Sequence, residues 1–116
     1  MGRAKEEAPE AYSIRISEHS LQNLDNITGY FAYIMHEPLN AIRVGDEIIR
    51  TIDRIEKHPF AFRACEEMST ANKIYRLAIC LSWLMIYKIK PAEIVILGII
   101  HCHRRSSRIK SLRKVK

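Results

Sequence analysis

The chain has 116 residues, of which 47% are hydrophobic, so it is long enough for one domain with a buried core and too short for two. Its three cysteines have no paired spacing, which argues against a disulfide framework and indicates reduced thiols in a cytoplasmic protein. The longest apolar stretch, residues 77–87, is about half as long as a membrane span, and the N-terminus lacks the apolar segment of a signal peptide.

The net charge of +6 is concentrated at the C-terminal end of the chain. Residues 104–116 contain seven lysines and arginines and no acid, whereas bases and acids nearly balance in the rest of the sequence. Such a block is usually a solvated extension. The alternative is that it binds phosphate groups or an acidic partner. We therefore expect a nearly neutral domain at residues 12–105, followed by a basic tail at residues 106–116.

Residues 1–11 are polar and mixed in charge, and we expect them to form a disordered leader. The stretch YSIRIS, residues 12–17, then alternates, with Tyr12, Ile14 and Ile16 on one side. Alternation with a period of two is typical of a half-buried strand. The domain is therefore expected to begin with a strand.

Two amphipathic helices are predicted next. Ser17 stands where an N-cap should be, and Glu18 lies in the first turn, where a negative charge suits the helix dipole. Pro38 is well placed to open the second helix, which ends before Pro59. Apolar residues recur at helical spacing: Leu21, Leu24, Ile27, Phe31 and Ile34, then Ala41, Ile48, Ile52 and Ile55. Two long helices with a short break predict an antiparallel hairpin.

The second half of the chain predicts a small sheet. Residues 60–73 have no clean period and are expected to form a loop. Three runs rich in β-branched and aromatic residues follow, at residues 74–80, 82–89 and 93–103, and their tight connections predict an antiparallel meander. The expected fold class is therefore α+β in the order β-α-α-β-β-β, with a two-helix hairpin packed on a small antiparallel sheet.

The last predicted strand is apolar on both faces, although a strand with one wet face should alternate between apolar and polar residues. Regular alternation would place its side chains in two sets: Ile94, Ile96 and Ile100 on one face, and Val95, Leu97 and Ile99 on the other. One helix hairpin covers only one face of a small sheet. We therefore expect a partner chain or the basic tail to cover the second face.

In this order the segments resemble the ParE/RelE toxins of bacterial type II toxin–antitoxin systems, over residues 12–105. The stretch YSIRISEHSLQNLDNITGYF is similar to the first strand and helix of the family. WLMIYKI is similar to its central strand, which ends in a tyrosine and a base, here Tyr87 and Lys88. ILGIIHCHRR is similar to its last strand, which ends in a histidine and, three residues on, an arginine, here His101 and Arg104.

The resemblance implies one of two activities. ParE-type toxins bind DNA gyrase and cause it to leave breaks in DNA, without catalysing a reaction themselves. RelE-type toxins enter the ribosomal A site and cleave mRNA, which requires a base near the ribose 2′-hydroxyl, cations at the phosphate and a proton donor. In an mRNA endonuclease of this type the catalytic candidates would be Arg76, His101, His103 and Arg104, with His103 as general acid or base.

Two departures from the RelE pattern favour the non-catalytic branch. RelE-like members usually place an arginine three residues before the central tyrosine, where this chain has Leu84. They also often carry a lysine pair on the preceding strand, where this chain has only Arg76 nearby. We therefore expect a gyrase inhibitor that is not an enzyme, with the ribosome-dependent mRNA interferase as the alternative. A small nucleic-acid-binding module that uses the basic tail is an alternative from another class.

Partner-binding residues are expected on the strand predicted at residues 82–89 and just after the last strand. Trp83, Met85 and Tyr87 share one strand face, for which core packing is the default and an antitoxin-binding groove is the alternative. Arg104 and Arg105 add positive charge beside that face.

The stretch His101-Cys102-His103 does not predict a metal site. Side chains alternate along a strand, so both histidines would share one face while Cys102 would point to the other. Tetrahedral zinc needs about four convergent ligands, and no paired cysteine or histidine elsewhere in the sequence supplies them. We therefore expect no metal and no cofactor.

Taken with the resemblance, the sequence predicts a cytoplasmic toxin that makes no membrane contact and that a cognate antitoxin protein holds inactive. Its target would be DNA gyrase, or the ribosome and mRNA in the alternative. The resemblance also implies contact with operator DNA only through the antitoxin, and the kind of role associated with plasmid stabilization.

Overall fold

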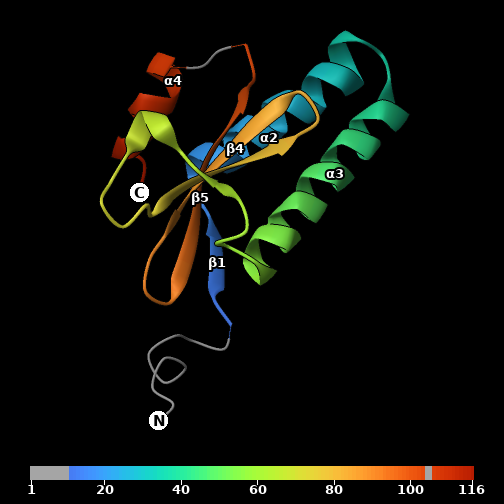
Figure 1. Cartoon of the computed structure of the whole chain (residues 1–116). Coiled ribbons are helices and arrows are strands. Elements are labelled where there is room, and N and C mark those ends of the chain that lie inside the picture. Colours follow the sequence, from blue (N-terminus) through green and yellow to red (C-terminus); the bar gives the residue numbers. More distant parts are fainter. Residues whose placement is uncertain (1–10, 104–105) are drawn as a thin grey trace.

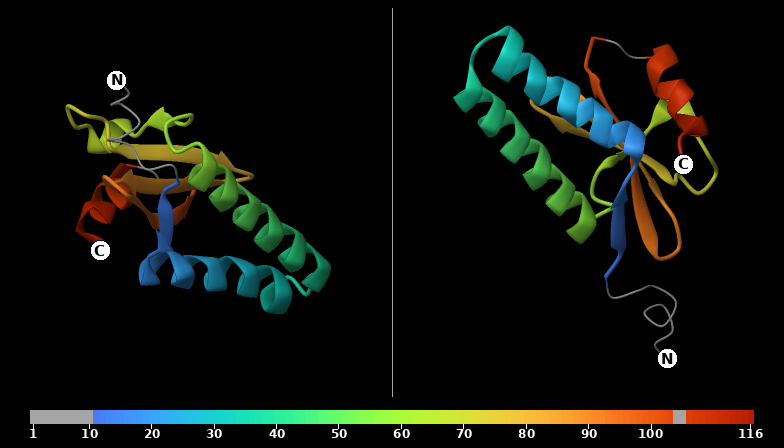
Figure 2. Two further views of the ribbon diagram at one scale, coloured as in Figure 1. Left: turned by 90° about the horizontal axis from the view of Figure 1, so that it is seen from below. Right: turned by 180° about the vertical axis from the view of Figure 1, so that it is seen from behind.

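A computed structural model describes residues 11–103 and 106–116 of the chain. A five-stranded sheet lies between a long helix hairpin on one face and a short C-terminal helix on the other (Figures 1 and 2). The expected α+β class and the hairpin-on-sheet arrangement are confirmed. In the part of the chain that the structure describes, no helix combines the length and the apolar character that crossing a membrane requires.

The hairpin forms where the sequence predicts it. Helix α2, Glu18–Gly29, begins after Ser17, whose Oγ accepts a hydrogen bond from the backbone N–H of Ser20 at 3.1 Å. Pro38 occupies the first turn of α3, Pro38–Lys57. Between them, residues Tyr30–Ile34 form one π-helical turn, which the apolar spacing did not predict. The buried residues of α3 include the predicted stripe: Ala41, Val44, Ile48, Thr51, Ile52 and Ile55.

The sheet has the order β1-β5-β4-β3-β2. Its strands are β1 Ser13–Ile16, β2 Arg63–Ala64, β3 Tyr75–Cys80, β4 Trp83–Ile89 and β5 Glu93–His101. The predicted antiparallel meander is confirmed for β3, β4 and β5. However, β1 pairs in parallel with β5, so the sheet is mixed rather than wholly antiparallel. Part of the expected loop at residues 60–73 also pairs, as the short edge strand β2 beside β3.

A β-bulge changes which residues of β5 face the hairpin. The pairing of β4 with β5 shifts register between Ile86 and Tyr87, because Ile86 lies opposite Gly98 and Tyr87 lies opposite Ile96. Beyond the bulge, Ile99 packs against the hairpin and Ile100 packs on the opposite face. The sequence-based assignment of these two residues to faces was therefore wrong, because an extra residue in one strand inverts the alternation.

The C-terminal segment covers the second face of the sheet. It consists of α4, Ser106–Ser111, and a 3-10 turn at Leu112–Lys114, and it buries Ile109 and Leu112 completely or nearly so (0% and 1% exposed). These side chains join Leu97 and Ile100 of β5 in one apolar cluster. The segment is therefore not the solvated extension that its charge indicated. A partner chain or the basic tail was expected to cover this face of the sheet, and in the structure the tail covers it.

Candidate functional site

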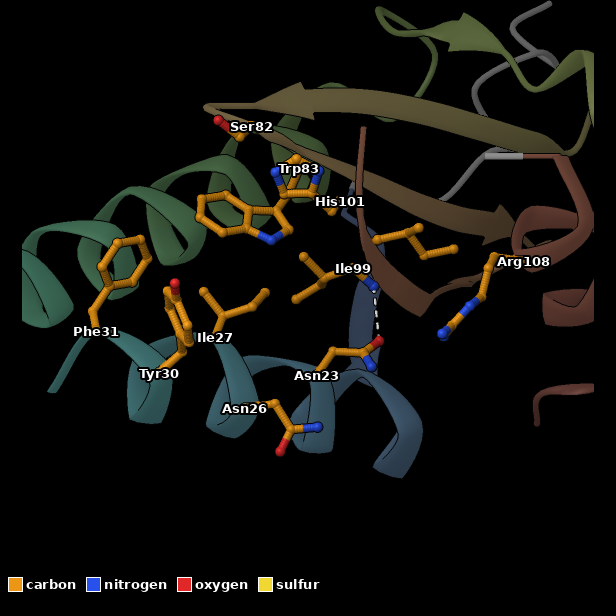
Figure 3. Close-up of a pocket in the computed structure, with 11 residues that line it drawn as sticks. Asn23, Asn26, Ile27, Tyr30, Phe31, Ser82, Trp83, Ile99, His101 and Arg108 are labelled. Atoms are coloured by element: carbon orange, nitrogen blue, oxygen red, sulfur yellow. Dashed lines mark hydrogen bonds between the residues drawn. The ribbon is translucent and has the colours of Figure 1, made fainter. Parts of the chain in front are cut away.

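A cleft of about 570 Å³ opens between α2 and the ends of β4 and β5 (Figure 3). Its lining combines aromatic and apolar side chains with a few polar groups from four parts of the chain: Asn23, Asn26, Ile27, Tyr30, Phe31, Trp83, Ile99, His101 and Arg108. Concave sites with this mixture bind organic groups, because the apolar walls exclude water while the polar groups fix orientation. The cleft is therefore the first candidate for contact with another molecule.

A row of aromatic rings forms the back of the cleft. The ring centroids of Phe31 and Trp83 lie 6.1 Å apart at 75°, and those of Trp83 and His101 lie 5.8 Å apart at 83°. Both pairs are edge-to-face, the arrangement that the charge distribution of aromatic rings favours. The row continues to His103, whose ring centroid lies 5.1 Å from that of His101. Packing on Trp83, its direct cross-strand partner, therefore positions His101 at the wall of the cleft.

Polar groups sit on the helical side and at the far end of the cleft. The Oδ1 atom of Asn23 accepts a hydrogen bond from the backbone N–H of Ile99 at 3.0 Å, which ties α2 to β5 just beyond the bulge (Figure 3). Asn26 of α2 and Arg108 of α4 also line the cleft. A bound group would thus meet an amide on one wall and a guanidinium at one end, a combination suited to the side chains of a protein partner.

Among the candidate catalytic residues that the structure describes, Arg76 lies apart from His101 and His103. Arg76 pairs with Tyr87, whereas His101 pairs with Trp83, four residues along β4, which corresponds to about 13 Å of strand. The guanidinium of Arg76 donates hydrogen bonds to the carbonyls of Phe62 at 2.8 Å and Lys73 at 2.9 Å. Of the predicted cluster, only His101 and His103 are close to each other, and Arg104 lies outside the described residues.

The predicted partner-binding residues divide into buried and accessible ones. Met85 and Tyr87 are fully buried under the hairpin, so they belong to the core and offer no surface to a partner. The Tyr87 hydroxyl donates a hydrogen bond to the Pro59 carbonyl at 2.6 Å, and burial raises the pKa of Tyr87. Trp83 is partly exposed and lines the cleft. Arg105, like Arg104, lies outside the described residues.

The local geometry at His101-Cys102-His103 differs from the strand that the sequence indicated. Strand β5 ends at His101, and the following turn brings one ligand atom of each of the three residues within 4.8 Å of the others. Cys102 packs against the apolar cluster on the opposite face, as the alternation predicts, and the turn still brings its sulfur near the two imidazoles. The group supplies three ligands, whereas structural zinc takes four, and in the described part of the chain no further histidine, cysteine or acid joins it.

A groove between α2 and α3 is a second candidate surface, which the sequence analysis missed. Its cavity is also about 570 Å³, and Gly29, Tyr33, Ile42 and Gly45 are among the residues that line it. Tyr33 is 78% exposed and Ile42 60% exposed, although both are large apolar side chains. The available signal was their position outside the buried stripes, on the side of each helix that turns away from the sheet.

A family model matches most of this chain, and a solved structure shares its fold. Residues 14–106 match the family described as the ParE toxin of the type II toxin–antitoxin system parDE. Among solved structures, the chain is similar to one of the chromosomal ParDE toxin–antitoxin system from P. aeruginosa, with a TM-score of 0.65 and 18% sequence identity. That similarity covers 78% of this chain and 95% of the other. A comparison with curated proteins finds no match.

Proposed function

The chain belongs to the ParE toxins of type II toxin–antitoxin systems, and from this membership we propose that it binds DNA gyrase in the cytoplasm, without catalysing a reaction, until a cognate antitoxin neutralises it. The family match over residues 14–106 carries the toxin assignment. The choice of target and of mode of action rests on the arrangement of the side chains, which favours a binding surface over a catalytic centre.

The observation that carries the non-catalytic mode is the separation of the groups that RNA cleavage would need. Cleavage requires a base, a cation at the phosphate and a proton donor within reach of one another. Arg76 is engaged with backbone carbonyls about 13 Å of strand away from His101. The Tyr87 hydroxyl is buried and hydrogen-bonded, and Leu84, at the position of an expected arginine, is buried on the opposite face.

We assign the cleft as the contact surface for gyrase. Its aromatic rear wall is rigid, because each ring packs against the next, and its rim presents an amide and a guanidinium. Rigid aromatic groups surrounded by polar ones are typical of the residues that contribute most to binding between proteins. A partner side chain entering between Tyr30 and Trp83 would be removed from water on both sides.

We assign the groove on the hairpin to the antitoxin. Its floor of small residues and its exposed Tyr33 and Ile42 suit the apolar stripe of an amphipathic helix. Asp25 and Asp46 line the same groove and favour basic residues beside that stripe. The groove and the cleft lie on different sides of α2. An antitoxin helix in the groove would therefore leave the cleft open, and another part of the antitoxin would have to cover it.

One observation favours the alternative, a ribosome-dependent mRNA endonuclease. The ring of His103 lies 5.1 Å from that of His101, which lines the cleft, and histidine is in general a side chain suited to acid–base catalysis. The proposal therefore requires a test in which both activities are measured on the same protein.

The test compares wild type, Trp83→Ala and His103→Ala, with His19→Ala on the exposed start of α2 as the matched control. Purified protein is added to gyrase with supercoiled DNA, and separately to ribosomes with mRNA. We expect linear DNA after protein removal with wild type, His103→Ala and the control, a loss of at least about tenfold with Trp83→Ala, and intact mRNA throughout. Cleavage of mRNA that disappears with His103 would overturn the gyrase assignment.

A further inference from the structure

A third concave surface, which shares no lining residue with the cleft or the groove, is lined mainly by positive charges. It has a volume of about 470 Å³ and lies on the face of the sheet that the C-terminal segment covers. Six cationic side chains line it: Arg15, Lys88, Lys90, Arg113, Lys114 and Lys116. They come from β1, from the end of β4 and from the C-terminal segment, three parts of the sequence that only the folded chain brings together. We call this surface the basic pocket.

The positive charge of the basic pocket is only slightly neutralised by the chain itself. Glu93 forms ion pairs with Arg15 at 3.2 Å and with Lys90 at 3.6 Å, and it is the one acidic side chain paired with these cations in the described residues. Glu93 therefore sets a single side-chain carboxylate against six cationic side chains. Concave surfaces lined by one sign of charge concentrate the electric field and attract ligands of the opposite sign.

Several of these cations are held in place rather than free to spread apart. The charged groups of Lys88 and Arg113 lie 5.5 and 5.4 Å from the centroid of the same ring, that of Tyr75. Arg15 donates a hydrogen bond from Nη1 to the main-chain oxygen of Lys116 at 3.0 Å, which fixes the C-terminal segment beside β1. Like charges kept close together repel one another, so a bound anion would relieve an unfavourable arrangement.

The chemistry of the lining points to a ligand with repeated charges and without specific recognition of bases. The remaining lining residues are Val95, Leu97 and Val115, which offer no hydrogen bonds from their side chains. Tyr75, the aromatic residue beneath the cations, is buried, so its ring is closed to base stacking. Four of the six cations are lysines, which act on phosphates as point charges. Contacts of this kind bind a nucleic-acid backbone regardless of its sequence.

We propose that the basic pocket binds the phosphate backbone of double-stranded DNA. Duplex DNA carries a denser row of charges than a single DNA strand, about one per 1.7 Å of helix axis, and therefore gains more from several cations gathered at one site. The interaction belongs to the chain itself and is independent of sequence, unlike the operator contact through an antitoxin that the family resemblance implies. It also does not involve gyrase, so an experiment can disprove DNA binding by the basic pocket without affecting the proposed function, and the reverse.

The experiment measures binding of the full chain to a fluorescent duplex of about 30 base pairs, with no gyrase present, over a range of salt concentrations. The variant is Lys90→Gln/Lys114→Gln/Lys116→Gln, three exposed positions whose substitution removes no apolar contact. The matched control is Arg43→Gln/Arg50→Gln/Lys57→Gln on the exposed side of α3, which lowers the net charge equally. Circular dichroism checks that both variants are folded.

We expect wild type and control to bind with a steep salt dependence. The variant should lose about 2.7 in the slope of log K against log salt, because each lost phosphate contact on duplex DNA removes about 0.9. An equal loss in the control would show that net charge alone attracts DNA and would overturn the proposal. Absence of binding by wild type at low salt would overturn it too, as would tighter binding of polyglutamate or of single-stranded DNA of equal length.

Discussion

Leu112 of the C-terminal segment packs directly onto Gly98 of β5, so closely that a Cβ atom on residue 98 would lie 2.7 Å from Leu112 Cδ2 and 2.9 Å from Cδ1. Real Cβ atoms do not approach carbon atoms this closely, so glycine is required at residue 98 for Leu112 to occupy its position. The contact joins the bulge in β5 to the segment that covers the second face of the sheet.

This contact predicts a non-additive pair of substitutions. Gly98→Ala should lower the free energy of unfolding by about 1–3 kcal/mol, because the added methyl group displaces Leu112. Leu112→Ala should lower it by about 2–5 kcal/mol, because it leaves a cavity. In the double variant the methyl group added at residue 98 partly fills that cavity, so the loss should be smaller than the sum of the two. Urea denaturation of the four proteins measures the coupling, and strict additivity would contradict the packing.

Deletion of residues 106–116 should unfold the chain or leave it aggregated. The deletion removes two buried side chains, Ile109 and Leu112, each worth about 2 kcal/mol or more, from a domain whose total stability is about 5–15 kcal/mol. It also exposes Leu97 and Ile100 to water. Thermal denaturation checks the prediction. The control, Lys110→Gln/Lys114→Gln, removes two charges from the same segment and should leave Tm nearly unchanged.

Alanine at two helical glycines should stabilise the isolated chain. A Cβ atom on Gly29 would lie 3.9 Å from Tyr33 and one on Gly45 would lie 3.5 Å from Thr28, which are ordinary contacts. Each substitution should therefore raise the free energy of unfolding by up to about 1 kcal/mol, the difference in helix propensity. Gly98→Ala, which has the opposite expected sign, is the internal control in the same denaturation experiments.

The same two alanines should weaken binding of the antitoxin, because both glycines line the groove assigned to it. Titration of the variants with the purified antitoxin measures the effect, and about a tenfold loss would match one misplaced contact at the centre of an interface. Tyr33→Asp in the groove should cost more, whereas Leu81→Asp, an exposed apolar residue in the turn between β3 and β4, should cost nothing. Unchanged affinity for Tyr33→Asp would place the antitoxin elsewhere.

Tyr87→Phe separates a structural role from a catalytic one. The substitution leaves the buried Pro59 carbonyl without its donor and should lower the free energy of unfolding by about 1–3 kcal/mol at neutral pH. DNA breakage by gyrase should remain. An equally stable variant that has lost activity would indicate a catalytic hydroxyl instead.

The hydroxyl of Tyr87 should also give stability a particular dependence on alkaline pH. Burial raises the pKa of Tyr87 above its ordinary value of 10.0, so the folded chain holds this proton more tightly than the unfolded chain does. The stabilisation is therefore fully present below pH 10 and is lost as the pH rises above it. Wild type should lose stability more steeply than Tyr87→Phe between about pH 10 and 11.5, as measured by urea denaturation.

Much of the fold could be predicted because its signals are local. Ser17 as N-cap and Pro38 at the start of α3 depend on neighbouring backbone groups, and the apolar stripes depend on helix geometry alone. The face of Ile99 could not be predicted, because the bulge lies in the pairing of β5 with β4 and Gly98 beside it packs on Leu112, contacts that local alternation does not encode. The parallel pairing of β1 is also set by distant residues, since alternation shows that a strand exists but not which strand is its neighbour.

The candidate site was less predictable than the fold. His101 was identified from the end of the last strand and Trp83 from a strand face that it shares with Met85 and Tyr87, and both line the cleft. Phe31 was assigned to a helix stripe and Arg108 to a solvated tail, because their roles depend on how α2 and α4 meet the sheet. For Met85 and Tyr87 the error was the reverse: they were predicted to bind a partner and are buried in the core. A strand face with alternating large side chains looks the same in the sequence whether a partner or the chain's own hairpin covers it.

The position of β5 between β1 and β4 determines when this toxin can become active during its own synthesis. Ser13 pairs with Glu93 and Ile16 with Ile96, so the first strand has no neighbour until the ribosome has made residues 93–96. At about 5–20 residues per second, the nascent chain spends several seconds with its hairpin made and its sheet incomplete. The cleft, built from α2, β5 and α4, does not exist during that time. A cell that translates the antitoxin in the same interval can therefore have it ready before the surface that we assign to gyrase exists.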